Sequence, residues 1–332
     1  SVERVAFDGN GVTLNGSTFT NEGITNLAFN TNGSDTINNA GSARTYEFGT
    51  ANTGNALFNM SGTSSVLNLT MMGTDGSPAA NDGMDANVGN LTVNLAGTAP
   101  AGTKATINID SQGDLAETGL NSFNDVGTVT AVAGSTINIT GEGNLDLAGL
   151  ANNGTIDASA ATGNLVLEGS DFANGPFVSG ADTITLGAGA DTVQFSSGAA
   201  SGVANATPGA ANTDLQVDVV NGFTAGNGGD VLDSTAAGGD SDYTALTAAA
   251  QAQIDALSGA TATLQNAADI AVANIAQDGV DAGEWSAFTF QGQSYAVYDA
   301  ADVAGETFDE ANDLLVQITG VSVADLNDTN FA

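Results

Sequence analysis

Two aspartates nine residues apart are the side chains in this sequence whose type and spacing point most directly to chemistry. The stretch GADTITLGAGADTVQF, residues 180–195, contains Gly-Ala-Asp-Thr twice, each time followed by an aliphatic residue, so that Asp182 and Asp191 are equivalent. Calcium takes about six to eight oxygen ligands, and a Gly-rich turn offers backbone carbonyls beside its carboxylate. We therefore expect Asp182 and Asp191 to hold one or two calcium ions.

The overall charge also requires cations. The chain has 38 Asp and Glu against 3 Lys and Arg, a formal net charge of −35, and its basic residues are Arg4, Arg44 and Lys104. Internal salt bridges cannot balance this excess, so we expect several calcium ions to bind through oxygen ligands. Such a surface repels phosphate backbones and anionic headgroups, which argues against nucleic acid and membranes as partners. The alternative is an acidic surface that is solvated and binds nothing specific.

The residue types argue against an enzyme. The sequence has no His and no Cys, which removes Ser-His and Cys-His nucleophilic sites, the usual zinc sites and the commonest general base. A pair of carboxylates could act as in a glycosidase, but among so many acids any pair is uninformative. No stretch approaches the roughly 18 consecutive apolar residues of a transmembrane helix, so we expect no membrane span.

Short segments with aliphatic residues at alternate positions recur at intervals of about nine to eleven residues, and a Gly, Asn or Asp often follows them. This alternation is typical of half-buried strands. Examples are 57–60, 66–69, 91–95, 107–109, 137–139, 145–147, 156–157 and 165–167. We expect an all-β fold, either an elongated β-solenoid or β-roll or a stacked β-sandwich. Outward Thr, Asn and Ser side chains could form polar ladders between stacked turns.

The region near the C-terminus has a different pattern. Helical spacing of aliphatic residues predicts two short helices, at 246–257 and 264–275, with Ser241 or Asp242 capping the first and Thr261 the second. We expect them to pack on the β core as a lid. The segment 287–298 predicts a β-hairpin with a turn at 291–293, and 314–318 predicts a last strand. Trp285 is expected to be a core residue.

These patterns divide the chain into three expected domains. Residues 1–135 form an irregular β-rich domain, 136–235 a β-solenoid with calcium-binding turns, and 236–332 a C-terminal domain with the helical lid and the hairpin. The first residues, SVERVAFDGNG, contain neither a starting Met nor the basic and apolar regions of a signal peptide. We therefore expect the chain to be the C-terminal part of a longer one.

The repeated phrase resembles the nonapeptide of repeats-in-toxin (RTX) proteins, G-G-x-G-x-D-x-U-x with U aliphatic. The fourth (Gly), sixth (Asp) and eighth (aliphatic) positions of the pattern match in both copies, and the second glycine matches in the later copy. The resemblance therefore implies these metal-binding residues: Gly180, Asp182, Gly187, Gly189 and Asp191. Leu186 stands where that copy should begin with Gly, and Phe177 and Val178 replace both leading glycines of the first copy. A long calcium roll is therefore not expected.

A wider resemblance covers roughly residues 130–332. Segment 218–233 looks like the strand pair that closes many RTX regions, which implies Asp230 and Asp233 as further ligands. Residues 156–193, the hairpin segment FTFQGQSYAVYDA and the ending LLVQITGV resemble the C-terminal regions of bacterial surface-layer (S-layer) proteins exported by type I secretion. A half-motif also occurs at Gly33-Ser34-Asp35-Thr36-Ile37, where an ordinary turn before a strand explains it equally well.

The resemblance implies a secreted structural protein of the bacterial cell surface. It would assemble with copies of itself into a calcium-dependent two-dimensional lattice and carry an uncleaved secretion signal in its last domain. A cell-surface polysaccharide is a further possible partner, bound through an N-terminal part that the sequence does not contain. The alternative function is an RTX-type adhesin, in which calcium stiffens a stalk and a separate module binds a surface.

Overall fold

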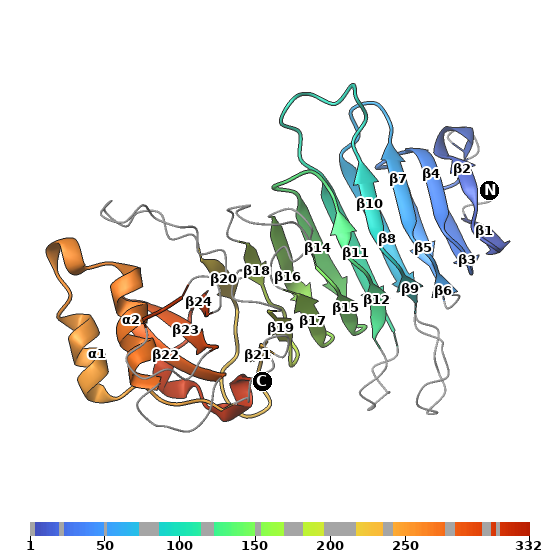
Figure 1. Cartoon of the computed structure of the whole chain (residues 1–332). Helices are drawn as coiled ribbons and strands as arrows, with labels where there is room; N and C mark the ends of the chain where they lie inside the picture. Colours follow the sequence, from blue (N-terminus) through green and yellow to red (C-terminus); the bar gives the residue numbers. More distant parts are fainter. Residues whose placement is uncertain are drawn as a thin grey trace. The chain divides into compact units, whose positions relative to one another are not determined.

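The fold is mostly β, in a computed structural model that describes residues 4–19, 23–49, 52–72, 86–113, 123–149, 154–168, 182–195, 217–234, 242–275, 283–300, 307–309 and 313–332 (Figure 1). The chain divides into two compact units. The first contains residues 1–167 and 187–189, and the second contains residues 168–186 and 190–332. None of the described helices is long and apolar enough to cross a membrane.

Parallel strands build the first unit, and they form three sheets. Sheet A has the order β1 (Arg4–Gly9), β3 (Asn26–Thr31), β5 (Thr45–Phe48), β8 (Val66–Met72), β11 (Thr106–Gln112), β14 (Thr136–Gly141) and β16 (Thr155–Ala161). Sheet B has the order β13 (Val129–Thr130), β10 (Leu91–Asn94), β7 (Ala56–Met60), β4 (Asp35–Ala40) and β2 (Thr13–Asn15). Sheet C has the order β17 (Leu165–Glu168), β15 (Leu145–Leu147), β12 (Asn124–Val126), β9 (Asn87–Val88) and β6 (Asn52–Thr53).

The chain visits these sheets in a fixed cycle. From β4 to β15 it passes from sheet B to sheet A to sheet C and back to sheet B, so that each strand pairs in parallel with the strand one coil earlier (Figure 1). After β15 the described residues 148, 149 and 154 form no strand in sheet B, and β16 follows directly in sheet A. Parallel pairing between successive coils is the arrangement of a β-solenoid or β-roll, whereas sandwiches are antiparallel.

Aliphatic residues of successive coils lie in register and form the core of the first unit. In sheet A, Leu67 pairs with Ile107, Ile107 with Ile137, and Ile137 with Ile156, and all four side chains are buried. This confirms that the aliphatic residues of the alternating pattern point inward. Identical positions repeat because each coil must place the same side of its strand against the core.

Asparagines form the polar ladders that the outward positions predicted. The Nδ2 group of Asn108 donates to Oδ1 of Asn68 over 2.7 Å, and Nδ2 of Asn138 donates to Oδ1 of Asn108 over 2.8 Å. Sheet B has a second ladder, through Asn38, Asn59 and Asn94. Because each amide both donates and accepts along the stack, these ladders favour the observed register.

Replacement of Ile137 by Ala is expected to destabilise the first unit strongly. The side chain is completely buried between Ile107 and Ile156, and truncation of a buried Ile costs about 2–5 kcal/mol. Urea unfolding should show the loss as a lower midpoint. The control is Thr140→Ala on the exposed side of the same strand, whose expected effect is below about 1 kcal/mol. Equal effects of the two substitutions would contradict the assignment of the core face.

The second unit combines strands with two helices. One sheet has the order β18 (Thr183–Thr185), β20 (Asp218–Asn221), β24 (Leu314–Ile318), β23 (Gln293–Asp299) and β22 (Glu284–Phe290), and β19 (Thr192–Gln194) pairs with β21 (Val231–Asp233). The helices are α1 (Ala248–Asp255) and α2 (Leu264–Ile275), and short 3-10 turns occur at Gly259–Thr261, Val323–Asp325 and Asp328–Asn330, besides one in the first unit at Gly16–Phe19. The antiparallel hairpin β22–β23 turns at Gln291 and Gly292, both with positive φ, as a tight hairpin requires.

Both predicted helices are present and pack on the sheet beside them. Ile254 of α1 and Val272 of α2 share a buried cluster with Phe288, Val297 and Leu315. Trp285 is also completely buried, so its prediction as a core residue is confirmed.

The predicted helix caps are wrong. Thr247 caps the start of α1, where its hydroxyl accepts the Ala250 N–H over 3.2 Å. Of the two residues predicted for this role, Ser241 lies outside the described residues, and the backbone carbonyl of Asp242 accepts the N–H of Trp285 where the chain is still extended. Thr263 accepts the Asn266 N–H ahead of α2, and Thr261 ends the preceding 3-10 turn.

Candidate calcium site

Two aspartates lie side by side on adjacent strands, at the N-terminal ends of β18 and β20. Thr183 of β18 pairs with Val219 of β20, and the residues directly before them are Asp182 and Asp218. The N–H of Asp182 donates to Oδ1 of Asp218 over 2.8 Å, and the carbonyl of Asp182 accepts the N–H of Val219 over 3.0 Å. Asp182 is 6% exposed and Asp218 is completely buried. We call Asp182 and Asp218 the first aspartate pair.

A second aspartate pair, Asp191 and Asp230, lies directly before the first residues of β19 and β21. The two residues precede Thr192 and Val231, which pair in parallel. The N–H of Asp191 donates to Oδ1 of Asp230 over 2.8 Å, and the N–H of Thr224 donates to Oδ2 over 2.7 Å. Both aspartates are almost completely buried. Asp182 and Asp191, the repeated residues of the sequence motif, therefore belong to different pairs.

Burial changes the ionisation of these carboxyl groups. Burial raises the pKa of Asp218 well above its usual value and the nearby carboxylate of Asp182 raises it further, while the hydrogen bond from the Asp182 N–H lowers it. The Oδ2 atom of Asp218 is buried and has no hydrogen-bond partner among the described residues. Burial also raises the pKa of Asp230, against the opposing effect of the N–H groups of Asp191 and Thr224. The first aspartate pair is thus the one with an unsatisfied acceptor.

The same hydrogen bond occurs at two corners of the first unit. Oδ1 of Asp35 accepts the N–H of Val12 over 2.8 Å, and Oδ1 of Asn124 accepts the N–H of Ala86 over 3.0 Å. In each case an Asp or Asn at the start of a strand binds the backbone of the preceding coil. Because Asn124 does this as a neutral amide, the corner itself does not require a negative charge.

No family model matches this chain. A search of curated proteins also found no match. The site must therefore be interpreted from its own geometry.

The other predicted metal ligands lie elsewhere. Gly180 is outside the described residues. Gly187 and Gly189 lie in the first unit, where a Cβ on Gly187 would come within 2.4 Å of the Ala161 carbonyl oxygen, and Gly189 has a φ of +141°. Glycine is needed at both positions for backbone packing. Asp233 ends β21, where its Oδ2 accepts the side-chain amide of Gln194 over 3.1 Å.

Asp218 is the residue that the nonapeptide pattern missed, because no glycine precedes it. A shorter pattern would have found it: an aspartate two positions before a buried aliphatic residue is common to Asp35, Asp182, Asp191, Asp218 and Asp230. Within the described part of the chain, no three or more His, Cys, Asp or Glu side chains gather into a metal-binding group, so the carboxylates meet in pairs. Any bound cation there would need backbone carbonyls or water as its remaining ligands.

Proposed function

We propose that this protein is a calcium-dependent structural protein that assembles into a surface-layer lattice outside a bacterial cell. The observation that carries the proposal is the first aspartate pair, in which two buried carboxyl groups are stacked and Oδ2 of Asp218 has no hydrogen-bond partner within the described ranges. Two ionised carboxylates at such a position repel each other, and a divalent cation removes this repulsion.

The comparison with Asn124 supports a cation at these corners. Asn124 makes the same backbone hydrogen bond without a charge, so an amide would suffice if closing the corner were the sole task. Instead, each aspartate pair has two buried aspartates next to each other on neighbouring strands. Asp182, Asp191, Asp218 and Asp230 would each supply a carboxylate to calcium, and the surrounding turns would supply carbonyl oxygens. Calcium would stabilise the contact between successive coils, because it would neutralise the carboxylates of each pair, which otherwise repel each other.

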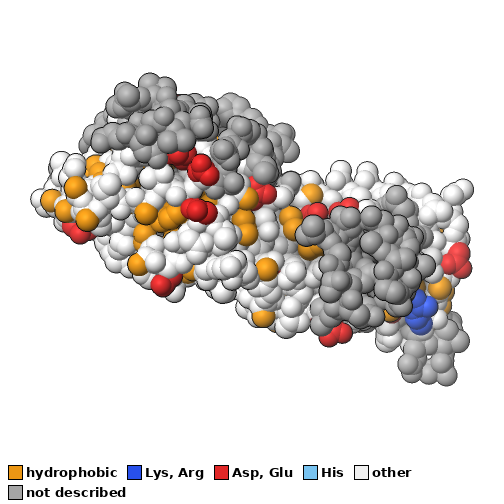
Figure 2. Space-filling view, turned by 90° about the horizontal axis from the view of Figure 1, so that it is seen from below, with side chains coloured by type: hydrophobic (Ala, Val, Ile, Leu, Met, Phe, Trp, Pro, Cys, Tyr) orange, Lys and Arg blue, Asp and Glu red, His pale blue; other side chains and the backbone are white. Residues whose placement is uncertain are grey.

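The charge of the whole chain supports calcium as a condition for assembly. Copies with a net charge of −35 repel one another, and Asp and Glu side chains occur at several separate places on the face shown in Figure 2. Cations bound at such places reduce the repulsion and let surfaces of two copies meet. The resemblance of residues 130–332 to S-layer proteins agrees with this role.

Electron microscopy of the purified protein tests the assembly. We expect ordered two-dimensional sheets in about 10 mM calcium and dispersed particles after chelation, because calcium must screen the like charges before copies can pack. A matched sample in sodium chloride of the same ionic strength separates specific calcium binding from general screening. Dispersed particles in calcium would contradict the lattice, and isolated rods that bind glycan arrays would favour the adhesin alternative.

A further inference from the structure

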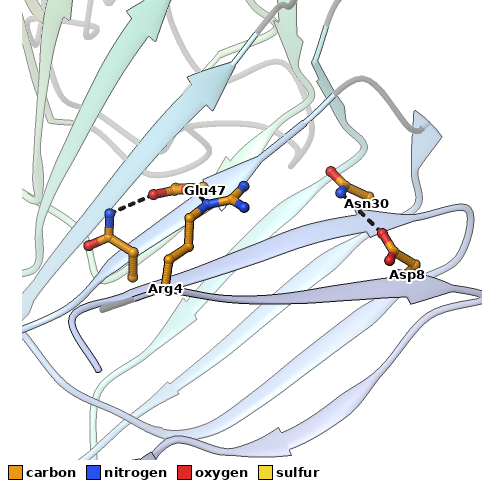
Figure 3. Close-up of polar contacts among 5 residues, drawn as sticks. Arg4, Asp8, Asn30 and Glu47 are labelled. Atoms are coloured by element: carbon orange, nitrogen blue, oxygen red, sulfur yellow. Dashed lines mark hydrogen bonds and ion pairs between the residues drawn. The ribbon is translucent and has the colours of Figure 1, made fainter. Parts of the chain in front are cut away.

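Arg44 is a buried cation that has no acidic partner among the described residues. Arg44 is 6% exposed, and its Nε atom is buried and has no hydrogen-bond partner in the part of the chain that the structure describes. Arg4, in contrast, forms an ion pair with Glu47, 2.5 Å from Nε to Oε2, while Asn30 donates to Asp8 nearby (Figure 3). Lys104 is exposed, and its ammonium group donates to the carbonyl of Ala133. A buried guanidinium is costly unless a counter-charge compensates it.

The neighbour of Arg44 does not provide that charge. The hydroxyl of Tyr46 accepts the N–H of Gly41 over 3.1 Å, and it also interacts with Arg44. Burial raises the pKa of Tyr46, so the phenol remains neutral at physiological pH. The guanidinium therefore has a hydrogen-bond acceptor beside it but no negative charge among the described residues.

A cavity of about 680 Å³ opens at Arg44. It lies where the chain passes from sheet B to sheet A, and the turns ahead of β3, β5 and β8 line it on three coils of the first unit. Its lining is rich in hydroxyl groups, from Ser17, Ser42, Ser61, Thr63, Ser64 and Ser65. The volume is within the range of about 300–1,000 Å³ typical of small-molecule sites. Hydroxyls both donate and accept, which suits a ligand that is itself polyhydroxylated.

Acidic residues are sparse at the same corner of the first unit, where the turn ahead of β3 contains one, Glu22, which lies outside the described residues. The turns 41–44, 61–65, 95–105 and 131–135, which all lead from sheet B to sheet A, contain no Asp or Glu in a chain that has 38 of them. They do contain two of its three basic residues, Arg44 and Lys104. An anionic ligand can therefore approach this corner with less repulsion than the net charge of the chain implies.

We propose that the cavity at Arg44 binds a carboxylated saccharide, such as a uronic acid. The guanidinium would bind the carboxylate, for which its planar geometry is suited, and the serine and threonine hydroxyls would bind the sugar hydroxyls. This site lies in the first unit, whereas both aspartate pairs lie in the second. It does not depend on the calcium or lattice proposals.

Isothermal titration calorimetry with a matched pair of disaccharides tests the ligand class. Cellobiouronic acid and cellobiose differ by one carboxylate in place of a CH₂OH group, and acetate provides the carboxylate alone. In about 0.15 M salt, which limits long-range repulsion, we expect cellobiouronic acid to bind at least tenfold more tightly than cellobiose or acetate. Equal binding of cellobiose would overturn the role of Arg44, and equal binding of acetate would overturn the saccharide. No heat of binding with any of the three would overturn the site.

Two variants test the residues. Arg44→Gln should weaken binding of cellobiouronic acid at least tenfold, because it removes the charge. Since Arg44 is buried, this variant could misfold, so Thr63→Trp at an exposed lining position provides a second test by filling the cavity. Lys104→Gln is the control, because Lys104 lies on the same corner outside the cavity lining. Wild-type affinity in Thr63→Trp, or an equal loss in Lys104→Gln, would overturn the assignment.

Discussion

Chelation of calcium is expected to lower the melting temperature of the protein by roughly 10 °C. Calcium sites of extracellular modules have Kd values of about 10⁻⁴–10⁻³ M, so about 10 mM calcium stabilises the folded state by about 1.4–2.7 kcal/mol per ion. Ions at the two aspartate pairs would together contribute about 3–5 kcal/mol. A change of 1 kcal/mol moves the melting temperature of a unit of this size by about 2–4 °C. Differential scanning calorimetry in calcium and in EGTA measures the shift.

Hydrogen exchange shows whether the effect arises at the proposed site. Loss of calcium should increase exchange first at the amides of β18–β21, while the amides of β8, β11 and β14 in the first unit remain protected. Magnesium is the control ion, and it should restore less stability because it requires a smaller octahedral site and keeps its water. Identical melting in calcium and in EGTA would rule out calcium as a structural ligand.

Asp218→Asn is expected to have opposite effects with and without calcium. Without calcium the variant should melt several degrees higher than the wild type, because it retains the acceptor for the Asp182 N–H and removes a buried charge beside Asp182. In calcium it should gain much less stability than the wild type, because a carboxylate ligand is lost. Calorimetry of both proteins in both buffers measures the four melting temperatures.

The pH dependence without calcium follows from the same group. The pKa of Asp218 in the folded protein is raised above 3.8, its value in the unfolded chain, so the folded state retains a proton that the unfolded state loses. This contribution to stability is fully present below the unfolded pKa and is lost as the pH rises through the folded pKa. The advantage of Asp218→Asn should therefore grow over that range. Asp8→Asn, at an exposed position, is the control. An advantage that is constant with pH would contradict the buried charge.

Local patterns predicted the elements of this fold well. Alternating aliphatic residues located strands such as Ile107–Ile109, helical spacing located both helices, and the Gln-Gly turn located the hairpin. These features depend on which face of a segment is buried, and one segment is enough to reveal that. The pairing of strands was not predictable in the same way, because alternation fits an antiparallel sandwich as well as parallel coils. Chain-distant contacts, such as Leu67 with Ile107, decide between them.

Three of the four aspartates of the candidate site were predicted, but their pairing was not. The nine-residue spacing located Asp182 and Asp191, but that spacing is the distance from a strand of one sheet to a strand of the next, so it separates them. Their partners, Asp218 and Asp230, are 36 and 39 residues further along the chain. Of these, only Asp230 was expected as a ligand. The cavity at Arg44 could not be predicted, because it combines turns from three coils that share no motif.

The coiled path of the first unit has a mechanical consequence. Hydrogen bonds between parallel strands run along the direction in which the coils stack, so tension in that direction loads one coil at a time instead of all strands together. The coils from β4 to β7, β7 to β10 and β11 to β14 contain 21, 35 and 30 residues. At about 3.4 Å for each extended residue, the release of the 35-residue coil would lengthen the chain by up to about 120 Å. A coat made of such units would yield in discrete, unequal steps under load and could recover coil by coil when the load is removed.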